Sequence, residues 1–341
     1  VVSYSTAPLA MSPKLIFSDI DGTLVHIADD KLQRYGTLSE DGRLFRVAEE
    51  STGPALSVRP LPVSSTGTVA FISEKTLKLV AELRKKGHIF VLISGARSST
   101  FMERLPYLPA ADAYVMENGG RIFLPSHPSN TAAPIVEDVV WRQHHVAAPM
   151  VLESVAPEER PGALWELYKK LQHEGWACDA NKYSTDFRVS LKKSHGKTAA
   201  DLERVILNLP SQLTSSFNLG SADFYPSTSG KDKAAQYLMS KFGFSKEESI
   251  SMGDDDNDLA LASVVGHTYI PGFTAASVRK AVEGNPLAFT VASHGAFLGT
   301  HEVLEMIQEL PVGSRRPWIV GSIFVLSLLL LARSRRRAAS T

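Results

Sequence analysis

The sequence predicts an α/β protein with a Rossmann-like parallel sheet that is interrupted by an inserted α+β domain. Two observations support this architecture. Short apolar runs alternate with amphipathic helices up to residue 120 and again after residue 231, which is the order of a parallel sheet with crossover helices. Between these two parts, strands with exposed alternation are mixed with helices. A length of 341 residues suits two domains of ordinary size.

The first part of the core begins with a short apolar run over residues 14–20. It ends at acidic residues, as expected for a buried parallel strand whose carboxyl end carries function. Apolar residues at helical spacing between Ser73 and Gly87 predict a capped amphipathic helix over 73–86. Further elements are expected at 88–93 (strand), 98–105 (helix) and 113–116 (strand).

Residues 26–68 interrupt this alternation of strands and helices. They are rich in Gly and Pro and show no sustained periodicity, so we interpret them as a long insertion with a hairpin near 38–47. A connection of this length is either functional or mobile.

The inserted domain is expected to span residues 121–225 as a cap between the two core segments, 12–120 and 226–311. Its expected strands are 121–124, 136–143, 186–191 and one or two within 217–225, and its expected helices are 158–174 and 198–207. The core then resumes with a helix at 231–242, a strand at 249–252 and a helix at 256–264.

The net charge of the chain is zero, yet the charge is unevenly distributed. Residues 312–341 carry six arginines and no acidic residue, so the rest of the chain is acidic. An acidic body has no general affinity for nucleic acid, and we expect none. The only cysteine, Cys178, excludes an internal disulfide. The sequence begins at Val1, and whether Met11 is the true start or residues 1–10 are a leader remnant stays open.

Trp318–Ala332 contains no charged residue and has arginines on both sides. A bilayer span needs roughly 17–25 residues, so this segment is at the short edge. We expect a hydrophobic C-terminal helix that anchors the chain by its tail with the body in the cytosol. A short span suits the outer membrane of a mitochondrion, peroxisome or plastid, and the endoplasmic reticulum is the alternative. The opposing interpretation is a buried core helix.

Asp19-Ile20-Asp21-Gly22-Thr23 directly follows the first strand. Residues two apart in a strand face the same way, so both carboxylates can point into one crevice at the strand's end. Two carboxylates there can divide the roles of nucleophile and acid/base, and they attract a hard divalent cation. The competing interpretation is an Asx-rich turn without chemistry.

Three further motifs follow strands or open helices. Ser94-Gly95 follows a strand and offers a hydroxyl and an amide to an anion, although it could be a plain N-cap. Lys231 opens a helix and suits a phosphoryl oxygen, with Lys233 as its rival. Four carboxylates fall within 254–258, and their mutual repulsion favours a bound cation over a merely acidic helix start.

Together these motifs resemble the haloacid dehalogenase superfamily. The resemblance is closest to the subfamily IIB members with a large α+β cap after the third strand, which include the Cof-type sugar-phosphate phosphatases, sucrose-phosphate phosphatases and phosphomannomutases. Glu117-Asn118-Gly119, just before the expected cap, matches a stretch that is usual in this subgroup. The resemblance covers roughly residues 12–25 and 70–310.

The resemblance implies a role for each matching residue. Asp19 would be the nucleophile and a Mg²⁺ ligand, and Asp21 the general acid/base and a ligand through its backbone carbonyl. The other implied roles are Ser94, Gly95 and Lys231 for the phosphoryl group, Asp254 as metal ligand, Asp258 and Asn257 as support for the metal shell, and Asn118 and Arg188 for the substrate.

The implied activity is Mg²⁺-dependent hydrolysis of a phosphate monoester of a small metabolite, a sugar phosphate above all, through an aspartyl-phosphate. Two alternatives stay open. A phosphosugar mutase would move the phosphate within one sugar instead of releasing it. A membrane-tethered binding module would have lost activity, although the intact set of acidic and basic residues argues against this.

Overall fold

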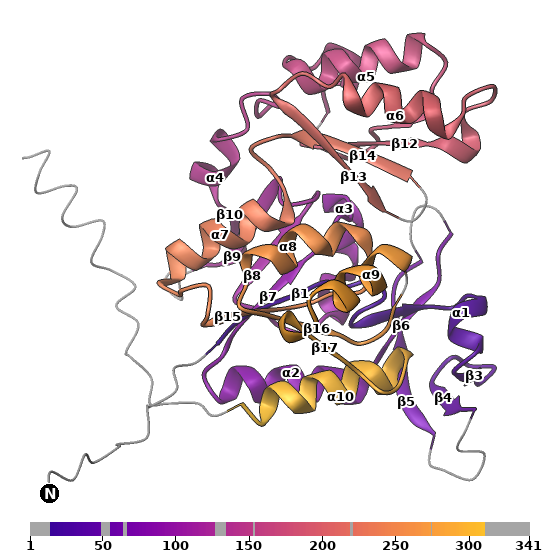
Figure 1. Cartoon of the computed structure of the whole chain (residues 1–341), viewed down its shortest axis with the longest axis vertical. Helices are drawn as coiled ribbons and strands as arrows, with labels where there is room; N and C mark the ends of the chain where they lie inside the picture. The colour runs from indigo at the N-terminus through magenta and orange to yellow at the C-terminus, as the bar shows by residue number, and fades with distance from the viewer. Residues whose placement is uncertain are drawn as a thin grey trace, which may run out of the picture.

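The computed structural model describes residues 14–48, 55–63, 67–126, 134–152, 154–218, 221–273 and 275–310. Its centre is an eight-stranded sheet in the order β10-β9-β8-β7-β1-β15-β16-β17 (Figure 1). Six neighbouring strands, from β8 to β17 in that order, run parallel, and β9 and β10 extend the sheet in antiparallel fashion. The strands are β1 (Leu15–Ser18), β7 (Ile89–Ile93), β8 (Ala113–Met116), β9 (Arg121–Pro125), β10 (Ile135–Glu137), β15 (Ser249–Met252), β16 (His267–Ile270) and β17 (Phe289–Val291).

Helices cover both faces of this sheet, which explains why its strands are apolar throughout. Alternation along β1 sends Ile16 into one apolar cluster and Leu15 and Phe17 into another. The first cluster includes side chains of α2 (Glu74–Lys85), α3 (Ser98–Arg104) and α10 (Ala296–Gln308), and the second those of α4 (Val139–Gln143), α7 (Lys231–Phe242) and α8 (Leu259–Val264). A further helix, α9, spans Ala276–Gly284. The predicted parallel α/β core is confirmed.

The cap is a four-stranded antiparallel sheet that lies above the core in Figure 1, with α5 and α6 on its outer side. Trp165, Phe187 and Phe224 are fully buried between this sheet and its helices. Its elements are β11 (Cys178–Asp179), β12 (Phe187–Ser190), β13 (Leu213–Asn218), β14 (Ser221–Pro226), α5 (Ala163–His173) and α6 (Ala199–Leu207).

The expected cap differs from the structure in three respects. β9 and β10, which were expected in the cap, belong to the core sheet, because β9 pairs with β8 and β10 pairs with β9. The expected strand over 136–143 stops after Glu137, because Asp138 accepts a hydrogen bond from the amide of Trp141 at 3.1 Å and caps α4. The expected helix over 158–174 begins only at Ala163, where Gly162 with φ +103° opens it.

The described residues of the insertion form more regular secondary structure than the sequence predicted. Its strands form a five-stranded antiparallel sheet in the order β2-β6-β5-β4-β3. The expected hairpin is present as β3 (Gly36–Leu38) and β4 (Leu44–Val47), whereas β2 (Val25–Ile27), β5 (Leu56–Pro60), β6 (Ala70–Ser73) and the short helix α1 (Asp30–Gln33) were not foreseen. A small apolar cluster of Leu32, Phe45, Val58, Phe71 and Phe297 joins this sheet to α10.

The hydrophobic C-terminal helix predicted over Trp318–Ala332 lies outside the described residues. Within the parts of the chain that the structure describes, no helix has both the length and the apolar character needed to cross a bilayer.

Phe297 joins the insertion to the core. Its ring meets His26 at 4.7 Å and Phe45 at 5.0 Å between centroids, both edge-on, and it is fully buried. We predict that Phe297→Ala lowers the free energy of unfolding by about 3–5 kcal/mol, since it removes a large buried ring. Urea denaturation measures this. Leu287→Ala, at a side chain that is 91% exposed, should have almost no effect, and equal effects of the two variants would contradict the packing described.

Candidate active site

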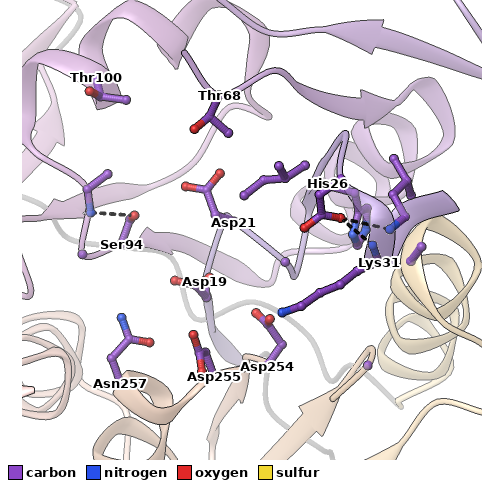
Figure 2. A pocket seen from close by; sticks show the side chains of 18 of the residues that line it. Asp19, Asp21, His26, Lys31, Thr68, Ser94, Thr100, Asp254, Asp255 and Asn257 are labelled. Atoms are coloured by element: carbon purple, nitrogen blue, oxygen red, sulfur yellow. Dashed lines mark hydrogen bonds between the residues drawn. The ribbon is translucent and has the colours of Figure 1, made fainter. Parts of the chain in front are cut away.

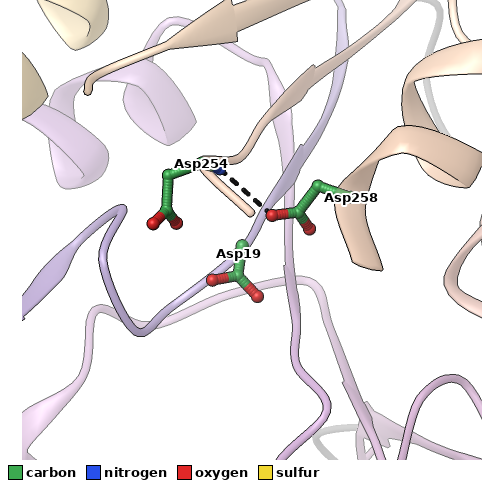
Figure 3. A group of neighbouring side chains, drawn as sticks. All are labelled: Asp19, Asp254 and Asp258. Carbon is green, nitrogen blue, oxygen red and sulfur yellow. Dashed lines mark hydrogen bonds between the residues drawn. The ribbon is translucent and has the colours of Figure 1, made fainter. Parts of the chain in front are cut away.

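The acidic motifs meet at the carboxyl end of the parallel strands, as their positions after β1 and β15 predicted. Asp19 follows β1, and Asp254 and Asp258 follow the neighbouring strand β15. One carboxylate oxygen from each of these three residues lies within 4.8 Å of the other two, and each residue is buried (Figure 3). Three buried carboxylates at this spacing need a compensating positive charge.

Lys231 supplies part of that charge. Its amine donates to Asp19 Oδ1 at 2.6 Å and to Asp258 Oδ1 at 2.7 Å, and its side chain is only 1% exposed. Burial alone would lower the pKa of Lys231, but the two carboxylates outweigh burial and raise it. The rival, Lys233, pairs instead with its neighbour Asp232 at 3.5 Å.

The surplus of carboxylates also affects Asp19. Burial raises the pKa of Asp19 well above its ordinary value, Lys231 opposes this rise, and Asp258 and Asp254 add to it. Asp19 Oδ1 is occupied by Lys231, and within the described residues its Oδ2 accepts no hydrogen bond. One oxygen of Asp19 is therefore available to an electrophile or a cation.

The three carboxylates differ in what their oxygens contact. Both oxygens of Asp258 are engaged, because Oδ1 binds Lys231 and Oδ2 accepts from the amides of Asp254 at 3.1 Å and Asp255 at 3.3 Å. Asp254 Oδ1 accepts from the Thr23 hydroxyl at 2.8 Å. Asp258 is thus placed to orient its neighbours, and Asp19 is the better placed of the two to bind a cation.

Gly22 lets the loop after β1 approach Asp254. Its φ is +93°, and an added Cβ would lie 2.2 Å from Asp254 Oδ2. No side chain fits there without displacing that carboxylate.

Asp21 is held by a residue that the sequence did not single out. Arg104, on α3 and 5% exposed, donates to Asp21 Oδ1 at 2.8 Å. The carboxylate of Asp21 points into the pocket in Figure 2. Arg104 reaches Asp21 because it lies on the face of α3 that is turned toward the site. The sequence alone does not show which face of α3 this is.

A cavity of about 410 Å³ opens in front of these residues. It is lined by the predicted residues Asp19, Asp21, Ser94, Gly95, Asp254, Asn257 and Arg188. The Ser94 hydroxyl accepts from the amide of Ala96 at 3.0 Å, and Asn257 makes no side-chain hydrogen bond within the described residues. The insertion forms one side of the cavity, and Tyr183 and Arg188 reach it from the cap.

Asn118 is not placed as expected. Its side chain is almost fully buried, and its amide donates to Asp186 at 2.7 Å and Asp223 at 3.3 Å, both in the cap. It does not line the cavity that contains Asp19. Asn118 therefore holds the cap against the core, whereas Arg188, which pairs with Asp223 at 2.6 Å, does face the cavity.

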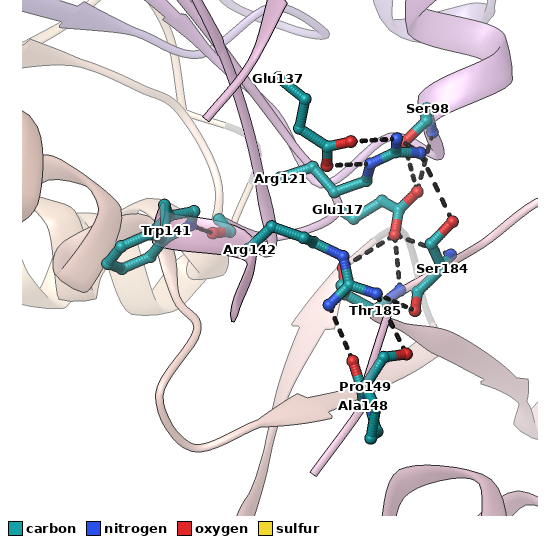
Figure 4. A network of polar contacts seen from close by, with 11 residues as sticks. Ser98, Glu117, Arg121, Glu137, Trp141, Arg142, Ala148, Pro149, Ser184 and Thr185 are labelled. Carbon is teal, nitrogen blue, oxygen red and sulfur yellow. Dashed lines mark hydrogen bonds and ion pairs between the residues drawn. The ribbon is translucent and has the colours of Figure 1, made fainter. Parts of the chain in front are cut away.

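Glu117 is a second link between the core and the cap (Figure 4). One oxygen accepts from the amide and hydroxyl of Ser98 on the core. The other accepts from the amides of Ser184 at 2.9 Å and Thr185 at 2.8 Å and from the Thr185 hydroxyl at 2.8 Å, all in the cap segment. One buried carboxylate thus receives five hydrogen bonds and fixes the orientation of the cap over the site.

Comparison with known proteins agrees with this architecture. Residues 177–282 match the family model of the haloacid dehalogenase-like hydrolases, a segment that includes Lys231, Asp254 and Asp258 but not Asp19. No curated protein matches the chain. The match confirms the predicted resemblance to this superfamily over residues 177–282.

Solved structures share the fold. The sucrose-phosphatase of Synechocystis sp. PCC6803, in complex with sucrose and phosphate, superposes with a TM-score of 0.55 at 14% identity, over 87% of this chain and 97% of that one. The Thermoplasma acidophilum 0175 protein superposes with a TM-score of 0.52 at 12% identity, over 87% of this chain and 99% of its own. At these identities the likeness concerns the fold.

We predict that Glu117→Gln destabilises the junction between the core and the cap. The introduced NH₂ group would face donors from either Ser98 or Thr185, so a buried polar group loses its partners, at a cost of about 2–4 kcal/mol. Hydrogen exchange of the amides of 184–185 and urea denaturation would both detect it. Glu166→Gln, on the exposed side of α5, is the matched control. Equal stability of the two variants would contradict the role of Glu117 in holding the cap to the core.

Proposed function

We propose that this haloacid dehalogenase-like hydrolase is a phosphatase that hydrolyses a phosphate monoester of a small metabolite, with Asp19 as the nucleophile. One observation carries the proposal. Asp19 stands at the strand end and faces a cavity of about 410 Å³. One of its oxygens binds the Lys231 amine at 2.6 Å, and the other accepts no hydrogen bond from the residues that the structure describes. This is the arrangement of a positioned nucleophile.

The donor set fits a divalent cation. Oxygen ligands are what Mg²⁺ prefers, and the buried carboxylates outnumber the single lysine among them. Asp19 and Asp254, with the backbone carbonyl of Asp21, would hold the ion, and Asp258 and Asn257 would support them. When bound, the cation would offset the repulsion between the Asp19 carboxylate and an anionic phosphate.

The remaining residues supply binding and proton transfer. The Ser94 hydroxyl and the Gly95 amide are placed to bind phosphoryl oxygens at the cavity edge, and Lys231 offsets their charge. An Asp19 oxygen attacks phosphorus and the bond to the leaving oxygen breaks, while Asp21 transfers its proton to that oxygen. Asp21 then takes a proton from the water that attacks the aspartyl-phosphate, which releases inorganic phosphate and restores Asp19.

Arg104 has a positioning role in this scheme. Its bond to Asp21 Oδ1 fixes the carboxylate and leaves Oδ2 without a hydrogen bond in the described part of the chain. Asp21 can then exchange a proton with the leaving group without rotating away from the pocket.

A sugar phosphate is the substrate class that we favour. The cavity has room for a small polar metabolite, and its cap wall offers Arg188 and Tyr183 for hydroxyl or ring contacts. Fold similarity does not separate a hydrolase from a phosphosugar mutase. Free phosphate from a sugar phosphate supports the hydrolase, and an isomerised sugar phosphate without release supports the mutase.

We expect Asp19→Asn to reduce phosphate release by roughly a thousandfold or more, because it removes the nucleophile. The assay follows release from a panel of sugar phosphates, nucleotides and an aryl phosphate, with Mg²⁺ and with a chelator. Chelation should abolish the activity and Mg²⁺ should restore it. Asp41→Asn, in the exposed β3–β4 turn, is the control. A folded Asp19→Asn protein with wild-type activity would exclude the mechanism.

Membrane anchoring through Trp318–Ala332 is a separate proposal, supported by its apolar composition and flanking arginines. We predict that alkaline carbonate leaves the full-length protein in the membrane pellet and that a chain ending at residue 311 is soluble. Recovery of the full-length protein in the carbonate supernatant would refute the anchor.

A further inference from the structure

The insertion places two basic residues in the cavity. Lys31 lies in α1, and Arg34 is the residue that follows the end of this helix. Both line the same cavity as Asp19 and Asp254. Figure 2 shows the Lys31 side chain extending from α1 toward Asp254. Both residues lie within the 26–68 insertion.

Although the Lys31 and Arg34 side chains are exposed, the helix that carries them is fixed. Asp29 caps α1 by accepting from the amides of Lys31 and Leu32, each at 3.0 Å. Leu32 is 5% exposed and packs in the apolar cluster with Phe45 and Phe297. The two cations are therefore held at one wall of the cavity by packed structure.

The other cations that line this cavity already have acidic partners. Arg104 pairs with Asp21, Arg97 with Asp179 at 2.8 Å and Arg188 with Asp223. Within the described residues, by contrast, neither Lys31 nor Arg34 forms an ion pair.

Two cations at a cavity wall that form no ion pair with a described residue are available to an anionic ligand. In the proposed mechanism, Lys231, Ser94 and Gly95 of the core already bind the phosphoryl group that Asp19 attacks. The charges of the insertion are thus available to a different part of the substrate.

We propose that Lys31 and Arg34 form an anion subsite for the leaving group, so that the substrate is a phosphate monoester with a second anionic group. This inference rests on the proposed phosphatase function. A carboxylate and a second phosphate satisfy the same subsite, because Arg binds either in bidentate fashion and Lys acts as a point charge. The insertion is then a specificity element that selects charged over neutral leaving groups.

Matched substrates test the subsite with the full-length protein and Mg²⁺. 3-Phosphoglycerate against glycerol 3-phosphate and 6-phosphogluconate against glucose 6-phosphate test a carboxylate. Fructose 1,6-bisphosphate against fructose 6-phosphate tests a second phosphate. In at least one pair, we expect kcat/KM to favour the charged member by about tenfold or more, the value of one charge-assisted hydrogen bond.

The variant Lys31→Gln/Arg34→Gln should lower this charged-to-neutral ratio by about tenfold. Lys78→Gln, an exposed lysine on α2 away from the cavity, should leave the ratio unchanged. If the double variant does not fold, Lys31→Gln alone gives the same readout.

The subsite would be refuted if the wild-type enzyme showed no higher kcat/KM for the charged member of any pair. It would also be refuted if the double variant lowered kcat/KM equally for both members of a pair. These outcomes differ from failure of the proposed function, in which even an aryl phosphate is not hydrolysed in an Asp19-dependent way.

Discussion

The contact of the Lys231 amine with Asp19 and Asp258 is the interaction on which the rest of the site depends. Three acidic side chains are buried together at the end of two parallel strands, and without a cation among them their repulsion and desolvation would oppose folding. Lys231 offsets part of this charge from the start of α7 and leaves the surplus that a divalent cation would balance. The same contact orients Asp19, the proposed nucleophile, so the stability of the site and the proposed chemistry depend on one contact.

The parallel sheet, the cap and the insertion contribute to the site in different ways. The parallel sheet brings residues far apart in the sequence to one edge, and Gly22 lets the β1 loop meet Asp254. The cap is fastened to the core by the buried carboxylate of Glu117 and covers the cavity with Tyr183 and Arg188. The insertion closes a further side and carries its own charges. In the proposed mechanism the chemistry belongs to the core, and selection among substrates belongs to the cap and the insertion.

The sequence was informative where local pattern and burial agree. Strands buried on both faces are short apolar runs, so β1, β7, β8 and β15 could be placed within a few residues, and the motifs after them indicated a shared edge. The acidic cluster could be predicted for the same reason, since the end of each strand is defined by where its apolar run stops.

The parts that were missed depend on contacts distant in the sequence. The strands of the insertion sheet are only three to five residues long, and the sheet packs against Phe297, which comes from α10, far away in the sequence. Arg104 and Lys31 gain their roles from the helices that face the cavity. Asn118 was expected at the substrate, but its partners are Asp186, just before β12, and Asp223 in β14, both in the cap. A local sequence pattern does not predict contacts between residues that are far apart in the sequence.

The most direct test of the account is to trap the covalent intermediate. The enzyme is mixed with Mg²⁺ and a substrate that it hydrolyses, quenched, and reduced with borohydride, which converts an acyl phosphate on aspartate to homoserine; peptide mass spectrometry then locates the change. The account predicts homoserine at position 19 and at no other aspartate. Phosphate release without modification of Asp19, or modification at Asp21 or Asp254 instead, would contradict it.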